Sequence, residues 1–146
     1  MRTYVEQFHE GQQADDELTA RIVLIEALLA QGKQGEAKKE MAAAQLLGNA
    51  SQNRFLRLQF ELASARVLLA SDDPETSRPL LQRIAGDAQR YGFVGVEFAD
   101  ELASAELANK TKHFSQAQMK LQALQNSAAA KGFGLIARKA LQKNPH

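Results

Sequence analysis

The chain has 146 residues and a formal net charge of +1, with 45% hydrophobic residues, no Cys and no Trp. Strong helix formers dominate it, with 25 Ala and 19 Leu against only 5 Val, 4 Ile and 4 Thr. This composition excludes an all-β or α/β fold, and the lack of cysteine excludes disulfide frameworks, thiolate metal sites and cysteine nucleophiles. The length fits one domain with a real core, so we expect an all-α protein.

The sequence carries no recognisable membrane-spanning or secretion signal. The chain contains no run of about 18 apolar residues that could span a bilayer. Its first ten residues lack the apolar core of a signal peptide. We therefore expect a cytoplasmic protein with no membrane partner.

An internal repeat is visible as sequence matches at a constant offset of forty residues. Four separate matches share this offset: 61–65 with 101–105, 92–93 with 132–133, 81–82 with 121–122, and 28–30 with 68–70. We interpret them as three copies of one structural unit.

Aligning the copies gives columns of apolar or small residues at helical spacing. The first face contains Ile22, Leu62 and Leu102, then Ile25, Ala65 and Ala105, then Leu28, Leu68 and Ala108. The second face contains Ala37, Ser77 and Ala117, then Met41, Leu81 and Leu121, then Ala44, Ile84 and Leu124. Steps of three and four indicate helices, so each copy predicts two amphipathic helices joined by a short turn.

The predicted elements follow in chain order. We expect helices near 14–31, 35–47, 52–70, 74–90, 94–110 and 114–131, and a closing helix near 134–143. Residues 1–13 form an N-terminal segment or the end of an upstream element, and 14–146 form the repeat domain, with repeats near 14–51, 52–92 and 93–132 and a cap at 133–146.

The helix ends carry recognisable signals. We expect the acidic pairs 15–16 and 72–73 to cap helix N-termini, with Pro74 in a first turn. Gly48, Gly92 and Gly132 are expected to end helices in the left-handed conformation. Pro79 lies either late in the first turn of the fourth helix or in a helix that begins nearer Thr76.

These columns resemble the tetratricopeptide repeat superfamily of helical-hairpin solenoids. The small residue in the middle of that family's first helix is matched by Ala65 and Ala105, and its second-helix pattern by Ala37, Met41 and Ala44. The chain departs from the family in its period of forty rather than thirty-four, and it lacks the early Trp and the late Pro. A longer period with Gly-Phe between hairpins is more similar to the divergent repeats attached to bacterial transcriptional activators of the maltose-regulon type and to bacterial serine/threonine kinases.

The resemblance implies a right-handed α-solenoid of three antiparallel hairpins with a C-terminal capping helix, for which Ile136, Ala140 and Leu141 are available. It also implies a non-catalytic protein-interaction or regulatory module, part of a larger bacterial signalling protein, that binds a peptide or protein segment on its concave face. The family's groove positions fall on eight residues: Glu26, Leu29, Gln59, Arg66, Leu69, Ala99, Glu106 and Asn109.

Two other functions stay open. The first is a self-assembly unit, for example a homodimer formed through an exposed N-terminal edge that carries Tyr4, Val5 and Phe8. The second is a small-molecule sensor that binds its ligand in the groove.

The sequence offers no pattern of reactive residues. His9, His113 and His146 are scattered, and no nucleophile, general base or phosphate-binding loop is identifiable. We therefore expect no catalytic, metal or cofactor site.

Charge is unevenly distributed along the chain. Beyond Glu106 there are seven basic residues and no acidic one, whereas the first 106 residues carry a net charge of −6. Such asymmetry is compatible with an acidic partner, a nucleic acid or a head-to-tail self-contact, although a solvated face is the simpler interpretation. Nucleic acid is disfavoured because Phe114 and Phe133 are the only aromatic residues in the basic segment.

Overall fold

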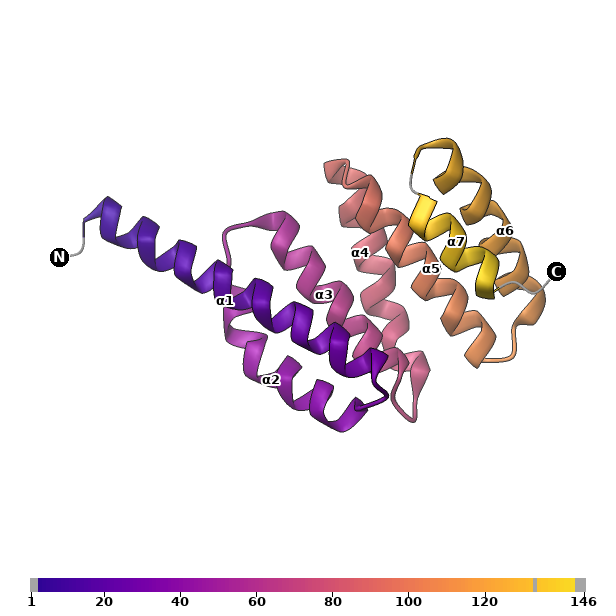
Figure 1. Cartoon of the computed structure of the whole chain (residues 1–146), viewed down its shortest axis with the longest axis horizontal. Coiled ribbons are helices and arrows are strands. Elements are labelled where there is room, and N and C mark those ends of the chain that lie inside the picture. The colour runs from indigo at the N-terminus through magenta and orange to yellow at the C-terminus, as the bar shows by residue number, and fades with distance from the viewer. Residues whose placement is uncertain (1–2, 133, 144–146) are drawn as a thin grey trace. The chain divides into compact units, whose positions relative to one another are not determined.

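The computed structural model describes residues 3–132 and 134–143, and that part of the chain is all-helical (Figure 1). This confirms the prediction of an all-α fold. The elements are α1 (Tyr4–Ala30), α2 (Gln34–Ala50), α3 (Arg54–Leu69), the 3-10 helix η1 (Pro74–Ser77), α4 (Arg78–Tyr91), α5 (Val94–Lys110), α6 (Phe114–Ala130) and α7 (Gly134–Lys143). Among the described residues, no helix combines the length and apolar character needed to cross a membrane.

The chain divides into two compact units, an N-terminal unit of residues 1–71 and a C-terminal unit of residues 72–146. The boundary lies inside the second repeat predicted from the sequence. In the N-terminal unit, α1, α2 and α3 all pack against one another. In the C-terminal unit, α4 packs on α5, α5 on α6, and α7 on both α5 and α6.

Each unit has its own hydrophobic core. The core of the N-terminal unit contains Leu18, Ile22, Ile25, Ala37, Ala44, Leu56, Phe60, Ala63 and Val67. The core of the C-terminal unit includes Phe98, Leu102, Ala105, Leu121, Leu124, Ala128, Ala137 and Ala140. The small residues of the aligned columns, among them Ala37, Ala65, Ala105 and Ala117, are fully buried, which is consistent with close approach of neighbouring helix axes.

Two of the three glycines that were predicted to end helices do so. Gly92 and Gly132 have φ of 74° and 84°, in the left-handed region that glycine adopts without steric cost. The Phe93 N–H then donates to the Ala88 carbonyl at 2.9 Å, which closes the end of α4. Phe133 lies outside the described residues.

Gly48 was wrongly expected to end a helix, because α2 continues through it to Ala50. A Cβ at Gly48 would lie 2.3 Å from Cδ1 of Phe60 on α3. Glycine is therefore required here by the close approach of the Phe60 ring and not by backbone conformation.

Two predicted N-terminal boundaries also change. α1 begins at Tyr4, where Thr3 and Glu6 form a capping box, so the helix includes most of the predicted N-terminal segment. Asp15 and Asp16 consequently lie inside α1 and cap nothing. Asp73 does precede a helical turn led by Pro74, but its side chain makes no capping hydrogen bond, and the turn is the separate 3-10 helix.

Candidate protein-binding site

The N-terminal third of α1 extends beyond the other two helices of its unit (Figure 1). Every residue from Thr3 to Gln13 is exposed, and the apolar side chains of Tyr4 and Phe8 are 91% and 69% exposed. We call residues 4–13 the α1 arm. Tyr4, Phe8, Gly11 and Asp15 continue, in steps of four and three, the spacing of the buried core residues that follow them in α1.

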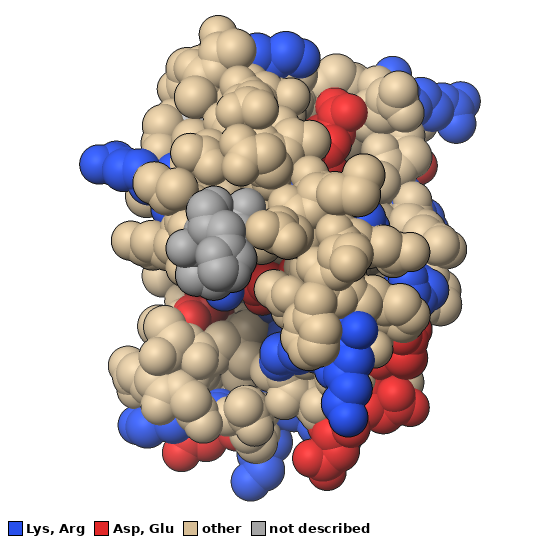
Figure 2. Space-filling model, turned by 90° about the vertical axis from the view of Figure 1, so that its right-hand side faces the viewer, with Lys and Arg blue, Asp and Glu red and all other residues tan. Residues whose placement is uncertain are grey.

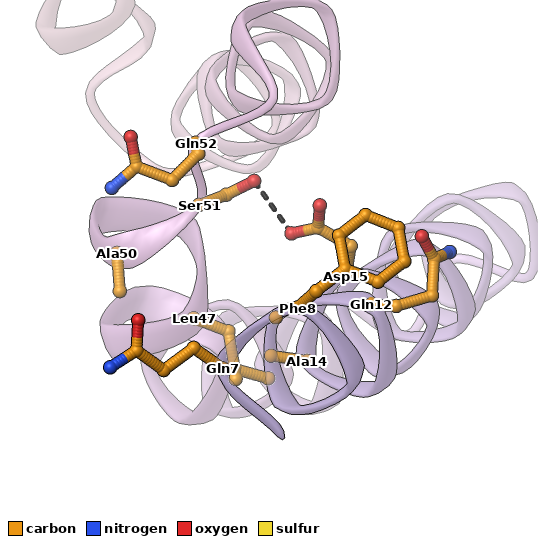
Figure 3. A pocket seen from close by; sticks show the side chains of 10 residues that line it. Gln7, Phe8, Gln12, Ala14, Asp15, Leu47, Ala50, Ser51 and Gln52 are labelled. Atoms are coloured by element: carbon orange, nitrogen blue, oxygen red, sulfur yellow. Dashed lines mark hydrogen bonds between the residues drawn. The ribbon is translucent and has the colours of Figure 1, made fainter. Parts of the chain in front are cut away.

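A cavity of about 280 Å³ lies where the arm passes the C-terminal end of α2 (Figure 3). Its lining is Gln7, Phe8, Gly11, Gln12, Ala14, Asp15, Leu47, Ala50, Ser51 and Gln52. All of these residues belong to the N-terminal unit. A Cβ at Gly11 would have no atom within 4 Å, so this glycine leaves open space beside the helix.

A short chain of hydrogen bonds forms the polar wall of the cavity. The Ser51 hydroxyl donates to Oδ1 of Asp15 at 2.7 Å, as Figure 3 shows, and accepts from the Asn53 N–H at 3.1 Å. The Asn53 side chain in turn accepts from the Leu56 N–H at 3.1 Å and caps α3. These bonds tie α1 to the start of α3, so the cavity has a defined wall on this side.

Within the N-terminal unit, the predicted groove residues lie on α1 and α3. Glu26 and Arg66, which are forty residues apart, form an ion pair with an Nη1–Oε1 distance of 3.4 Å. Together with the Asp15–Ser51 bond, this pair shows that α1 and α3 run side by side in register with the repeat. Gln59 is half-buried, whereas Leu29 packs against the core and Leu69 is only 3% exposed, so these two offer little surface to a partner.

The cavity lies on the same face of α1 as the predicted groove. Phe8, Asp15 and Glu26 are separated by seven and eleven residues, which is two and three helical turns, and therefore share one side of the helix. We name this side, together with the facing residues of α3, the α1–α3 face.

The remaining predicted groove residues lie on α5 in the C-terminal unit. Glu106 forms an ion pair with Lys143 of α7, with an Oε1–Nζ distance of 3.0 Å. Ala99 and Asn109 are half-buried. Glu106 is thus held against α7 in the same way that Glu26 is held against α3.

One buried acidic side chain was not singled out from the sequence. Asp100 of α5 is 2% exposed, and its Oδ1 accepts no hydrogen bond from any residue that the structure describes. Burial, together with the nearby charge of Glu101, raises the pKa of Asp100 to about 7, while Lys120 lowers it. The spacing from Val96 through Asp100 to Ala103, along an apolar stripe, is the sequence signal that could have identified it.

Neither of the two described histidines lines the cavity, although His9 contacts Phe8 at its edge. The His9 ring packs edge-on against Phe8 with centroids 6.2 Å apart, and His113 Nδ1 lies 3.0 Å from the Thr111 hydroxyl. His146 lies outside the described residues. In the part of the chain that the structure describes, no three His, Cys, Asp or Glu side chains cluster as metal ligands would.

Basic side chains do not gather into one band on the face drawn in Figure 2, where uncharged surface and some acidic groups separate them. Nucleic-acid binding usually uses a continuous basic patch or stripe, and the face drawn in Figure 2 does not present one.

Comparison with known proteins gives no relative from which a role could be read. No family model matches the chain, and no curated protein or solved structure matches it significantly.

Proposed function

We propose that this chain is a non-catalytic protein-binding module of the tetratricopeptide-like solenoid type, acting in the cytoplasm as part of a larger signalling or regulatory protein. Its ligand is a peptide or protein segment that lies along the α1–α3 face. The observation that carries the proposal is the cavity between the α1 arm and the end of α2, with exposed Phe8 at its edge.

The exposed position of the cavity favours a side chain over a free small molecule. Ligand and cofactor pockets bury most of the ligand, whereas this cavity of about 280 Å³ is bordered by the exposed α1 arm. One large apolar side chain of a partner would fit it. A protein-binding module therefore fits the cavity better than a small-molecule sensor does.

The charges along the α1–α3 face favour a ligand of mixed polarity. Asp15 lies beside the cavity, and the Glu26–Arg66 pair lies three helical turns further along α1. Both partners of that pair remain partly accessible, with side-chain exposures of 47% and 30%. A segment that places an apolar residue in the cavity could therefore also make polar contacts near the ion pair.

Selection from a library of random twelve-residue peptides tests the proposal, followed by affinity measurements using fluorescence anisotropy. We expect the selected peptides to share one large apolar residue. Gly11→Leu should fill the cavity and weaken binding at least tenfold, although leucine is the better helix former and should not destabilise α1.

Gly86→Ala is the matched control, because Gly86 lies on α4 with open space around it. This variant should bind the peptides as the parent chain does. Failure to enrich any peptide would contradict the proposal, and so would peptides whose affinity Gly11→Leu leaves unchanged.

A further inference from the structure

The face of α1 opposite its core is uncovered, whereas the corresponding faces of later helices are packed. Three later helices each pack on the helix that precedes them in the chain: α3 on α2, α5 on α4, and α7 on α6. The described residues contain no helix before α1. Among the described residues, no helix therefore covers the side of α1 that faces away from its core.

The aligned columns show the difference residue by residue. Phe60, Asp100 and Ala140 occupy one column and are all buried, but Ala20, forty residues before Phe60, is exposed. Val23 is 60% exposed although it aligns with buried Ala63. Small and apolar residues that elsewhere meet a preceding helix therefore face solvent on α1.

We define this uncovered face as the α1 outer face, consisting of Asp16, Ala20, Val23, Leu24 and Ala27, all of which are exposed. It is distinct from the α1–α3 face, since it lies on the opposite side of the helix from Leu18 and Ile25. Its one charged member is Asp16, which is exposed.

The other end of the chain presents the complementary surface. In α7, Ala137 and Ala140 are buried, whereas Leu135, Arg138 and Lys139 are exposed. With the exposed Gln142, these three form the α7 outer face. No acidic residue follows Glu106 in the sequence, so this face is basic with one exposed leucine at its start.

We propose that the chain binds a second copy of itself head to tail, with the α7 outer face of one copy packed on the α1 outer face of the next. Leu135 would lie against the small apolar residues of α1, with Arg138 and Lys139 close to Asp16. The two surfaces differ, so the contact is heterologous and leaves one free edge at each end of an assembly.

The charges of the two faces favour this head-to-tail arrangement over a symmetric dimer. Pairing two α1 outer faces would place no positive charge of either face near Asp16, and pairing two α7 outer faces would bring Arg138 and Lys139 of both copies together. Like charges in contact oppose association, whereas opposite charges favour it and make it sensitive to salt.

Sedimentation velocity on the full chain tests the proposal with two edge variants. In the first, Asp16→Lys and Val23→Lys place two positive charges on the α1 outer face. In the second, Leu135→Gln, Arg138→Gln and Lys139→Gln remove the leucine and both positive charges from the α7 outer face. All five positions are exposed helix surface, so each variant should fold. Far-ultraviolet circular dichroism is the check on folding.

We expect the parent chain to grow beyond a dimer as its concentration rises, and to dissociate when NaCl is raised from 50 to 500 mM. Each variant alone should remain a monomer. An equimolar mixture of the two should form dimers and nothing larger, because only one intact α1 outer face and one intact α7 outer face are available per pair.

A parent chain that stays monomeric at millimolar concentration would overturn the proposal. So would a parent that stops at a dimer, or a mixture of the variants that remains monomeric. Because the α1 outer face is not the peptide-binding face, the result is independent of the peptide selection. Either proposal can fail while the other stands.

Discussion

The helices α1, α2 and α3 of the N-terminal unit correspond to α5, α6 and α7 of the C-terminal unit at an offset of eighty residues. α2 and α6 have equal lengths and begin and end eighty residues apart, at Gln34–Ala50 and Phe114–Ala130. In each unit, all three helices pack on one another. The helical framework is therefore the same, although few of the aligned core residues are identical.

The two cores differ in how side-chain volume is divided between two facing helices. In the N-terminal unit, Gly48 of α2 faces the large ring of Phe60 on α3, whereas the corresponding residues of the C-terminal unit are Ala128 and Ala140. One arrangement combines the smallest side chain with a large one, and the other combines two small ones. A smaller side chain on one helix is matched by a larger one on the facing helix, since close-packed interiors do not tolerate a change on one side alone.

The largest expected effect on stability comes from replacing Gly48 and Phe60 with alanine, the residue found at both corresponding positions of the C-terminal unit. Phe60→Ala should lower the free energy of unfolding by about 3–5 kcal/mol, because a buried ring is lost. Gly48→Ala alone should cost about 1–3 kcal/mol by overpacking against Phe60. In the Phe60→Ala background, Gly48→Ala should instead gain up to about 1 kcal/mol through helix propensity.

Urea unfolding of the four proteins in this double-mutant cycle measures the coupling. Gly86→Ala on α4 is the control for propensity alone and should be stabilising. Equal costs of Gly48→Ala with and without the Phe60 ring would show that the two residues do not constrain each other.

Asp100 should give the next largest effect, through the dependence of stability on pH. It occupies the column of Phe60 and Ala140, but its carboxyl has a pKa of about 7 when folded and an ordinary value of 3.8. Between these values the folded state holds a proton that the unfolded state has lost, so stability should fall by up to a few kcal/mol as the pH rises from about 4 to 7.

Asp100→Asn removes the titrating group while keeping its shape. Thermal unfolding of both proteins at several pH values should show a smaller loss of stability between pH 4 and pH 7 in the variant. The raised pKa of Glu101, caused chiefly by burial, contributes in the same direction and should leave a residual slope. Parallel pH profiles for the two proteins would contradict the assigned pKa of Asp100.

A smaller effect is expected at the turn between α5 and α6. Lys112 has a φ of 66° and occupies the position of Gly32, which has a φ of 74° in the turn between α1 and α2. A left-handed backbone costs a non-glycine residue about 1–2 kcal/mol, although glycine also loses more entropy on folding. Lys112→Gly should therefore gain up to about 1 kcal/mol in urea unfolding, and Gly32→Ala should be destabilising by a comparable amount. A destabilising Lys112→Gly would mean that the side chain of Lys112 contributes more than its backbone costs.

The smallest effect concerns an ion pair whose charges are exchanged between the units. Arg21 of α1 contacts Glu40 of α2 with an Nη1–Oε1 distance of 2.6 Å, and the hydrogen bonds that Arg21 donates to Glu40 and to Glu17 raise the pKa of Arg21. The corresponding residues of α5 and α6 are Glu101 and Lys120, which also attract each other. The double substitution Arg21→Glu with Glu40→Lys should therefore restore most of the small loss in thermal midpoint that either single substitution causes. A double variant as unstable as the sum of the two single ones would show that the exchanged pair does not form.

The sequence alone was sufficient to predict the helical class and most turns. Gly92 and Gly132 end helices as expected because a left-handed cap leaves a local signal. Gly48 does not, because a glycine required by close approach looks the same in sequence as one required by a turn. Only the position of Phe60 in three dimensions separates the two cases.

The candidate site was less predictable than the fold. The pairing of Glu26 with Arg66 follows from the repeat, and both were identified as groove residues. Asp15 was misinterpreted as a helix cap because the start of α1 was placed near residue 14. The cavity depends on the helix continuing back to Tyr4, and this continuation is set by the capping box at Thr3 and by the unbroken spacing through Phe8.

Amide hydrogen exchange measured residue by residue, with and without a selected peptide, tests the central claim most directly. In the free protein, the α1 arm should exchange much faster than the part of α1 that contains Leu18, Ile22 and Ile25, because nothing in its unit covers it. With peptide bound, new protection should appear in residues 7–15 and 47–52. Protection confined to the C-terminal unit, or no change in the arm and the end of α2, would contradict the assignment of the cavity as the binding site.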